Sequence, residues 1–152
     1  MFGFIDTLFT DLHPIVVHFP IAFFTLSFLL VLVGRVWPQA HQTEWLLFVL
    51  GAMTAPVAVI TGLIAHFPYE DTELHALIEP HQLSAIFGTV LIIALVVWRG
   101  LSRRRGRDIG QKGWYVAIAV LGLVWIFIVG GTGGQLVYDY AVNVRGVNPL
   151  LP

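Results

Sequence analysis

The stretch IVVHFPIAFFTLSFLLVLVGRVW, residues 15–37, decides the fold. It is apolar over about the 20 residues that an α-helix needs to cross the hydrocarbon core of a bilayer. Three further stretches of the same character follow at residues 45–65, 81–98 and 114–136. A helix satisfies its own backbone hydrogen bonds in lipid. The sequence therefore predicts an all-α fold, a bundle of four transmembrane helices.

The composition favours a membrane protein over a soluble one. Apolar residues make up 57% of the 152 residues, charged residues make up 11%, and the mean hydropathy is +0.83. A soluble domain carries about 25% charged residues. The chain has no cysteine, which excludes disulfides, iron–sulfur clusters, thiolate zinc sites and covalently attached c-type haem. A single integral membrane domain is expected over residues 1–152, with bilayer lipid as its main partner and no nucleic acid.

Charged residues predict the orientation of the chain. Seven of the eight Lys and Arg residues lie in segments 35–44 and 99–112, and only Arg145 lies on the opposite side. The positive-inside rule places those two segments in the cytoplasm, so both termini are expected on the extracytoplasmic side. That side also holds seven acidic residues: Asp6, Asp11, Glu70, Asp71, Glu73, Glu79 and Asp139. Four tryptophans flank the spans at the cytoplasmic end, as in an aromatic belt: Trp37, Trp45, Trp98 and Trp114.

The segments outside the spans carry weaker signals. The N-terminus lacks the positive region and cleavage site of a signal peptide, so the first span is expected to stay in the membrane. Segment 67–80 is expected to carry a short interfacial helix after Asp71 that ends at Pro80. The basic segment 99–112 is interpreted as the topology signal and a contact for lipid headgroups.

Histidines gather at the extracytoplasmic ends of the spans. Five of the six lie there: His13, His18, His66, His75 and His81. His18 lies about one turn inside the first span, and His81 opens the third on a face with Ser84, Ala85 and Gly88. Such small faces are typical of close helix packing and equally leave room for a flat macrocycle. His41 stands apart in segment 35–44 and is expected to be a solvated loop residue.

The fourth span ends in GGTGG, residues 130–134. Each glycine costs a helix up to about 1 kcal/mol relative to alanine. Two interpretations stay open. The glycines allow tight packing or fraying at the interface, or they allow the backbone to approach a bound group. In the second case Gly133 and Gly134 lie beside that group.

Four motifs spread along nearly the whole chain carry a family resemblance. They are LHPIVVHFPIA at 12–22, TGLI at 61–64, the histidine that opens the third span, and GGQLVYDYAVNV at 133–144. These motifs resemble the DUF2231 family of four-helix bacterial membrane proteins. The resemblance implies a bacterial membrane protein. Together with the orientation expected from the basic residues, it predicts an inner-membrane location with the histidines facing the periplasm. It also implies a redox setting by association, because the domain occurs beside c-type cytochromes.

The chain departs from the family pattern at two places. Family members tend to have glycine where this chain has Ala141. Many also carry an acidic residue after the glycine–leucine pair, where this chain has Ala65 and His66. The second departure is compatible with an added ligand or with the loss of a family role.

A b-type cytochrome is the favoured function. Haem b needs no cysteine and one or two axial ligands, and helical bundles build such sites between facing helices. His18 and His81 are the expected axial pair, His13 and His66 are candidates for a second haem, and Gly133 and Gly134 would face the porphyrin. Electrons would come from a quinol or leave to a c-type cytochrome.

Three alternatives remain. Imidazoles also bind zinc or copper, although none of the histidine pairs has the i, i+4 spacing of a short metal motif. The chain could instead be a cofactor-free anchor, either a homo-oligomer or a subunit of a larger membrane redox complex. A channel or proton path is disfavoured, because no acidic residue is expected deep in a span. Whether the chain is an enzyme stays open.

Overall fold

The computed structural model describes residues 12–144 and 146–148. The expectations for Asp6, Asp11 and Arg145 fall outside these residues. The described elements are α2 (His18–Val33), α3 (Ala40–His66), the 3-10 turn η1 (Phe67–Tyr69), α4 (His75–Arg104), the 3-10 turn η2 (Ile109–Gln111) and α5 (Tyr115–Tyr138). Helical residues before α2 extend the first span to Leu12–Val33.

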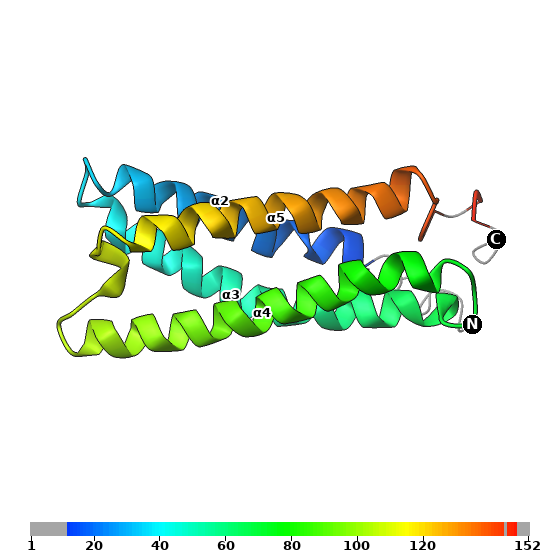
Figure 1. The fold of residues 1–152 in the computed structure, drawn as a ribbon, viewed down its shortest axis with the longest axis horizontal. Helices are drawn as coiled ribbons and strands as arrows, with labels where there is room; N and C mark the ends of the chain where they lie inside the picture. The colour runs from blue at the N-terminus through cyan, green and yellow to red at the C-terminus, as the bar shows by residue number, and fades with distance from the viewer. Residues whose placement is uncertain (1–11, 145, 149–152) are drawn as a thin grey trace.

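The four long helices form an antiparallel bundle (Figure 1). Helix α2 packs against α3 and α5, and α4 packs against α3 and, less extensively, α5. Each helix is long and apolar enough to cross a membrane, and the described residues contain no strand. The predicted all-α bundle of four spans is confirmed.

Two helices are longer than the sequence indicated. Helix α3 begins at Ala40 rather than at residue 45, and α4 runs from His75 to Arg104 rather than over 81–98. The prediction of a separate interfacial helix ending at Pro80 is wrong, because α4 continues through that residue. Proline costs the helix one hydrogen bond. It lies only one turn and a half from the start of α4, where few such bonds depend on it.

The core lies mainly in the half of the bundle where α2 joins α3. Phe24, Phe28 and Phe48 are buried there, with ring centroids 5.9 to 6.1 Å apart. Gly51 makes this packing possible, since a Cβ at that position would lie 2.5 Å from the Phe24 ring. A smaller cluster of Tyr69, Ile78, Leu136 and Val142 closes the other end. Most other large apolar side chains are exposed, as expected of a bundle surrounded by lipid.

The bundle has two chemically different ends. The end where α2 meets α3 and α4 meets α5 holds the basic segments and the four tryptophans; we call it the basic end. Trp98 and Trp114 stack there with centroids 5.9 Å apart. The opposite end holds the start of the first span, η1, the start of α4 and the last turns of α5; we call it the histidine end.

The chain leaves α5 through a strained turn. Ala141 has a φ of 53°, in the left-handed region that favours glycine. The turn is held by Tyr69, whose hydroxyl accepts a hydrogen bond from the Asn143 backbone N–H at 2.8 Å. Glycine adopts this backbone conformation without strain, which is a physical reason for the glycine that the family resemblance leads one to expect at position 141. This chain has alanine there, in a strained conformation.

Candidate functional site

His13 lies between the start of the first span and α3. Its Nδ1 lies 3.0 Å from the Ala58 carbonyl oxygen and 3.3 Å from Thr61 Oγ1. The absence of a side chain at Gly62 leaves room for the ring, because a Cβ there would lie 2.8 Å from His13 Cε1. The small face of α3 thus receives an imidazole from a neighbouring span.

His81 lies between α4 and α5 in a similar way. Its Nδ1 lies 3.0 Å from Thr132 Oγ1. A Cβ at Gly133 would lie 3.0 Å from His81 Cε1. Of the two open interpretations of GGTGG, close packing therefore applies at Gly133, and the group packed there is an imidazole.

His18 is exposed on the first turn of α2, and its Nδ1 lies 2.5 Å from the Pro14 carbonyl oxygen. No described contact joins His18 to another histidine. The ring is oriented within its own helix and points to the outside of the bundle.

These three imidazoles share one protonation pattern. A carbonyl oxygen only accepts, so Nδ1 of His13 and of His18 must carry the proton. The Thr132 hydroxyl donates to the Val129 carbonyl at 3.0 Å, which leaves it to accept from Nδ1 of His81. Each neutral ring then keeps a lone pair on Nε2. A metal-ligating histidine usually has this arrangement, with the distal N–H bound to a carbonyl or similar acceptor.

His66 and His75 form a separate pair where α3 approaches the start of α4. Their rings stack at 5.2 Å with planes 22° apart. His66 Nδ1 bonds the Gln82 side-chain oxygen, and its Nε2 is buried without a partner, as is Nδ1 of His75. His75 also lies 4.0 Å from Glu79. The departure at His66 thus places a buried imidazole in the bundle.

Glycines on another face of α5 lie open. A Cβ at Gly130, Gly131 or Gly134 would meet no atom within 4 Å. Gly130 and Gly131 line an apolar groove of about 510 Å³ between α5 and α2. On α2 the groove is lined by Ile21, Ala22, Thr25 and Leu26, so His18 lies one turn before it on the same helix face.

The structure brings the predicted site residues together only in part. His66 contacts His75, and His81 packs against Gly133. His13 shares no described contact with His81. His18 and His81 share no described contact. Within residues 12–144 and 146–148, no group of three or more His, Asp or Glu side chains is placed to hold one metal ion.

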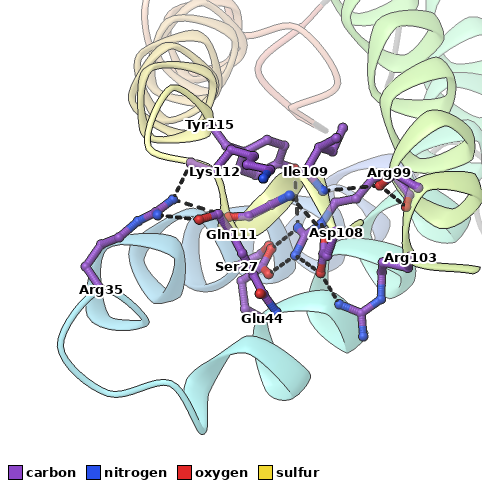
Figure 2. Close-up of polar contacts among 12 residues, drawn as sticks. Ser27, Arg35, Glu44, Arg99, Arg103, Asp108, Ile109, Gln111, Lys112 and Tyr115 are labelled. Carbon is purple, nitrogen blue, oxygen red and sulfur yellow. Dashed lines mark hydrogen bonds and ion pairs between the residues drawn. The ribbon is translucent and has the colours of Figure 1, made fainter. Parts of the chain in front are cut away.

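The basic end contains a buried ionic network that the sequence analysis missed (Figure 2). Arg99 is fully buried. Its two terminal nitrogens donate to the two Glu44 carboxylate oxygens at 2.6 and 2.5 Å, and its Nε donates to Asp108 Oδ1 at 2.9 Å. Ser27 donates to Glu44 at 3.2 Å, and Tyr115 lies 3.3 Å from the guanidinium. Arg99 of α4 thereby bonds to α3 and α5 directly, and Glu44 extends the network to α2 through Ser27.

Neighbouring groups extend this network to the loop between α4 and α5. Arg103 pairs with Asp108, and the Gly110 N–H donates to the same carboxylate at 2.8 Å. Burial alone would raise the pKa of Asp108, but Arg99, the Gly110 N–H and Arg103 outweigh burial and hold that pKa below its usual value of 3.8. Arg35 binds the loop through the carbonyls of Gly110, Gln111 and Lys112.

Three interpretations of the basic segments need correction. Arg99 is a buried residue of α4, so segment 99–112 is more than a topology signal. Glu44 is a buried residue of α3, near the membrane boundary, rather than part of a loop. His41 is a half-buried residue of the first turn of α3, packed against Gly34, rather than a solvated loop residue. The signal that could have found the network is the pair Glu44 and Asp108, two carboxylates among seven basic residues.

The chemistry of the Arg99 network is that of a structural element that stabilises the bundle. The buried guanidinium donates to two carboxylates and a hydroxyl and lies 5.1 Å from the Trp45 ring centroid and 4.9 Å from that of Tyr115. Such a group has no donor left for a substrate. The histidine end, by contrast, presents ring nitrogens that have no partner among the described residues, and it is the candidate functional site.

Comparison with known proteins supports the membrane assignment. The model of one protein family, described as a predicted membrane protein (DUF2231), matches residues 10–146. No curated protein and no solved structure matches the chain. The family match covers all four spans and both of the distinctive terminal motifs. The chain therefore belongs to the DUF2231 family of predicted membrane proteins.

Proposed function

We propose that the histidine end binds haem b and that the chain transfers electrons in the membrane. The observation that supports this proposal is the shared hydrogen-bond pattern of His13, His18 and His81: Nδ1 of each ring lies at an acceptor, and Nε2 has no partner among the described residues. Three rings from two different spans are already oriented by second hydrogen bonds. Ligand rings held in this way lose little freedom on metal binding.

The contacts favour His81 with His13 as the axial pair. Both rings are half-buried, and both pack against glycines of a neighbouring span. The pair expected from sequence, His81 with His18, has weaker support because His18 points to the outside of the bundle. His66, with its buried free Nε2, is the candidate ligand for a second haem.

Ligand number favours haem over zinc or copper. A structural zinc site needs four protein ligands and a catalytic one needs three. The described residues place no three candidate ligands together. A haem brings four nitrogen ligands of its own and takes only one or two from the protein.

The apolar groove between α2 and α5 suggests where an electron donor would bind. It is open, apolar and floored by Gly130 and Gly131, and His18 lies one turn away on the wall formed by α2. A membrane quinol would place its apolar tail in such a groove and give up two electrons to the haem, one at a time. Its two hydroxyl protons would leave to Nε2 of His18 and to water. A periplasmic c-type cytochrome would accept each electron in turn, with the histidine end facing the periplasm of the inner membrane.

Absorption spectroscopy tests the haem proposal. The protein purified in mild detergent from haem-supplied cells is expected to show a Soret band that shifts on reduction with dithionite. His81→Ala is expected to abolish the band and His13→Ala to convert the spectrum to a five-coordinate form. His18→Ala is expected to keep the spectrum and slow reduction by a soluble quinol analogue.

Gln135→Ala is the matched control. Gln135 is an exposed residue of the same end without a described side-chain contact, so its variant should keep the spectrum and the reduction rate. A colourless protein that carries stoichiometric zinc or copper by elemental analysis would contradict the proposal. So would a colourless, metal-free protein that co-purifies with fixed subunits, the behaviour of a structural anchor.

A further inference from the structure

A polar pocket lies at the basic end, away from the histidines. It has a volume of about 530 Å³ and lies where the α2–α3 turn meets α4 and the α4–α5 loop. The polar side chains that line it are Arg35, His41, Gln42, Arg103 and Gln111. No described lining residue carries a carboxylate.

Hydrogen-bond donors outnumber acceptors around this pocket. A guanidinium has five N–H groups. Arg35 uses three of them on the carbonyls of the α4–α5 loop, and Arg103 has one described bond, to Asp108. Nδ1 of His41 is buried without a partner. Several donors and the positive charge of Arg35, which has no described carboxylate partner, therefore remain for an anion with several acceptor oxygens.

The level of the pocket along the bundle identifies the source of such an anion. Trp37, Trp45, Trp98 and Trp114 mark the same end, and tryptophans gather at the headgroup level of a bilayer. Arg35 also follows directly after the last turn of α2, at the limit of the apolar span. The phosphates of a surrounding bilayer lie at this level.

We propose that this pocket binds the phosphate of an anionic phospholipid headgroup. Arg35 supplies the charge, and Arg103, Gln42, Gln111 and His41 supply hydrogen bonds. Arg35 and Arg103 also bind the α4–α5 loop directly, so the lipid would stabilise the junction between that loop and the α2–α3 turn. The site is independent of the haem proposal.

Lipid-dependent thermal unfolding of the delipidated protein in detergent tests this inference. Phosphatidylglycerol is expected to raise the unfolding temperature, whereas phosphatidylcholine and inorganic phosphate are not. Gln42→Glu places a negative charge in the pocket through an exposed residue and is expected to weaken phosphatidylglycerol binding about tenfold. Gln42→Lys is expected to strengthen it, which keeps the test informative if the first variant folds poorly.

Arg105→Gln is the matched control. It changes the net charge by the same amount at the same end, but Arg105 is exposed and does not line the pocket. Its affinity for phosphatidylglycerol should stay within about twofold of the original. Equal loss in Gln42→Glu and Arg105→Gln would show diffuse attraction and overturn the proposal. Equal stabilisation by phosphatidylcholine, or by inorganic phosphate alone, would overturn it as well.

Discussion

The two ends of the bundle use their polar groups in opposite ways. At the basic end the central cation, Arg99, is surrounded by carboxylates and aromatic rings, and every helix contributes to its surroundings. At the histidine end His13, His18 and His81 each use Nδ1, and Nε2 has no partner in the part of the chain that the structure describes. The first arrangement fixes the bundle, and the second makes ligand binding possible. Substitutions at the two ends should therefore differ in their effects on stability.

Arg99→Ala is expected to destabilise the protein most. Removing one partner of a buried ion pair leaves the other charge uncompensated, which costs about 3–5 kcal/mol. Here Glu44 would lose its only cation among the described ion pairs. Denaturant unfolding in detergent, followed by circular dichroism, measures the loss. Arg105→Ala, at an exposed site nearby, should change the free energy of unfolding by less than about 0.5 kcal/mol. Equal effects of the two variants would show that the network contributes little.

A pair of glycine substitutions compares packing at the two ends. A Cβ at Gly110 would lie 2.1 Å from Arg99 Cζ, whereas one at Gly131 would meet nothing within 4 Å. Gly110→Ala is therefore expected to cost about 1–3 kcal/mol through overpacking. Gly131→Ala should be neutral or stabilise α5 by up to about 1 kcal/mol. Thermal unfolding of the two variants in one detergent makes the comparison, and a cost at Gly131 would mean that its open face is occupied in the membrane.

Ala141→Gly is expected to stabilise the histidine end. The left-handed conformation costs an alanine roughly 1 kcal/mol, which glycine avoids. Part of that gain is lost to the greater freedom of glycine in the unfolded chain. The free energy of unfolding should therefore rise by a few tenths to about 1 kcal/mol. Ala117→Gly, a substitution within α5, should lower it by a similar amount and serves as the control. A loss of stability in Ala141→Gly would argue against the turn described here.

The pH dependence of stability gives the smallest expected effect. The pKa of Asp108 is lower in the folded protein than its usual value of 3.8, so the folded state binds fewer protons than the unfolded state in acid. The stabilisation is complete above that usual value and is lost as the pH falls through the lower, folded pKa. Unfolding measured between pH 6 and about pH 2 should show a decline that is shallower in Asp108→Asn. An unchanged slope would contradict the pairing of Asp108 with the two arginines.

The sequence predicts the spans well because lipid imposes one simple rule. Runs of apolar residues 20 or so long have few alternatives to a helix. The same rule explains the errors at the ends of α3 and α4. Glu44 and Arg99 were assigned to loops because each charge alone is costly in a span, and the sequence does not show that they neutralise each other 55 positions apart.

The sequence was sufficient to predict that the candidate site consists of histidines and that they lie at one end of the bundle. It was not sufficient to predict which histidine packs against which neighbouring helix. The position of His81 at the start of the third span was sufficient to place it near the glycines of the fourth. Whether His13 or His18 lies nearer to it depends on the start of the first span, where the regular helix shifts to a turn at Val17. Local periodicity gives no information on such a shift.

The network around Arg99 also bears on how the chain is made. The residues of the network come from α2, α3, α4, the loop after α4, and α5. The Arg99 guanidinium therefore gains its last partners, Asp108 and Tyr115, only after α4 has been synthesised. A nascent chain that ends at Arg104 would hold this arginine against Glu44 alone. Insertion of the final span would then complete assembly, and ribosome-bound chains of increasing length should become resistant to protease abruptly at that point.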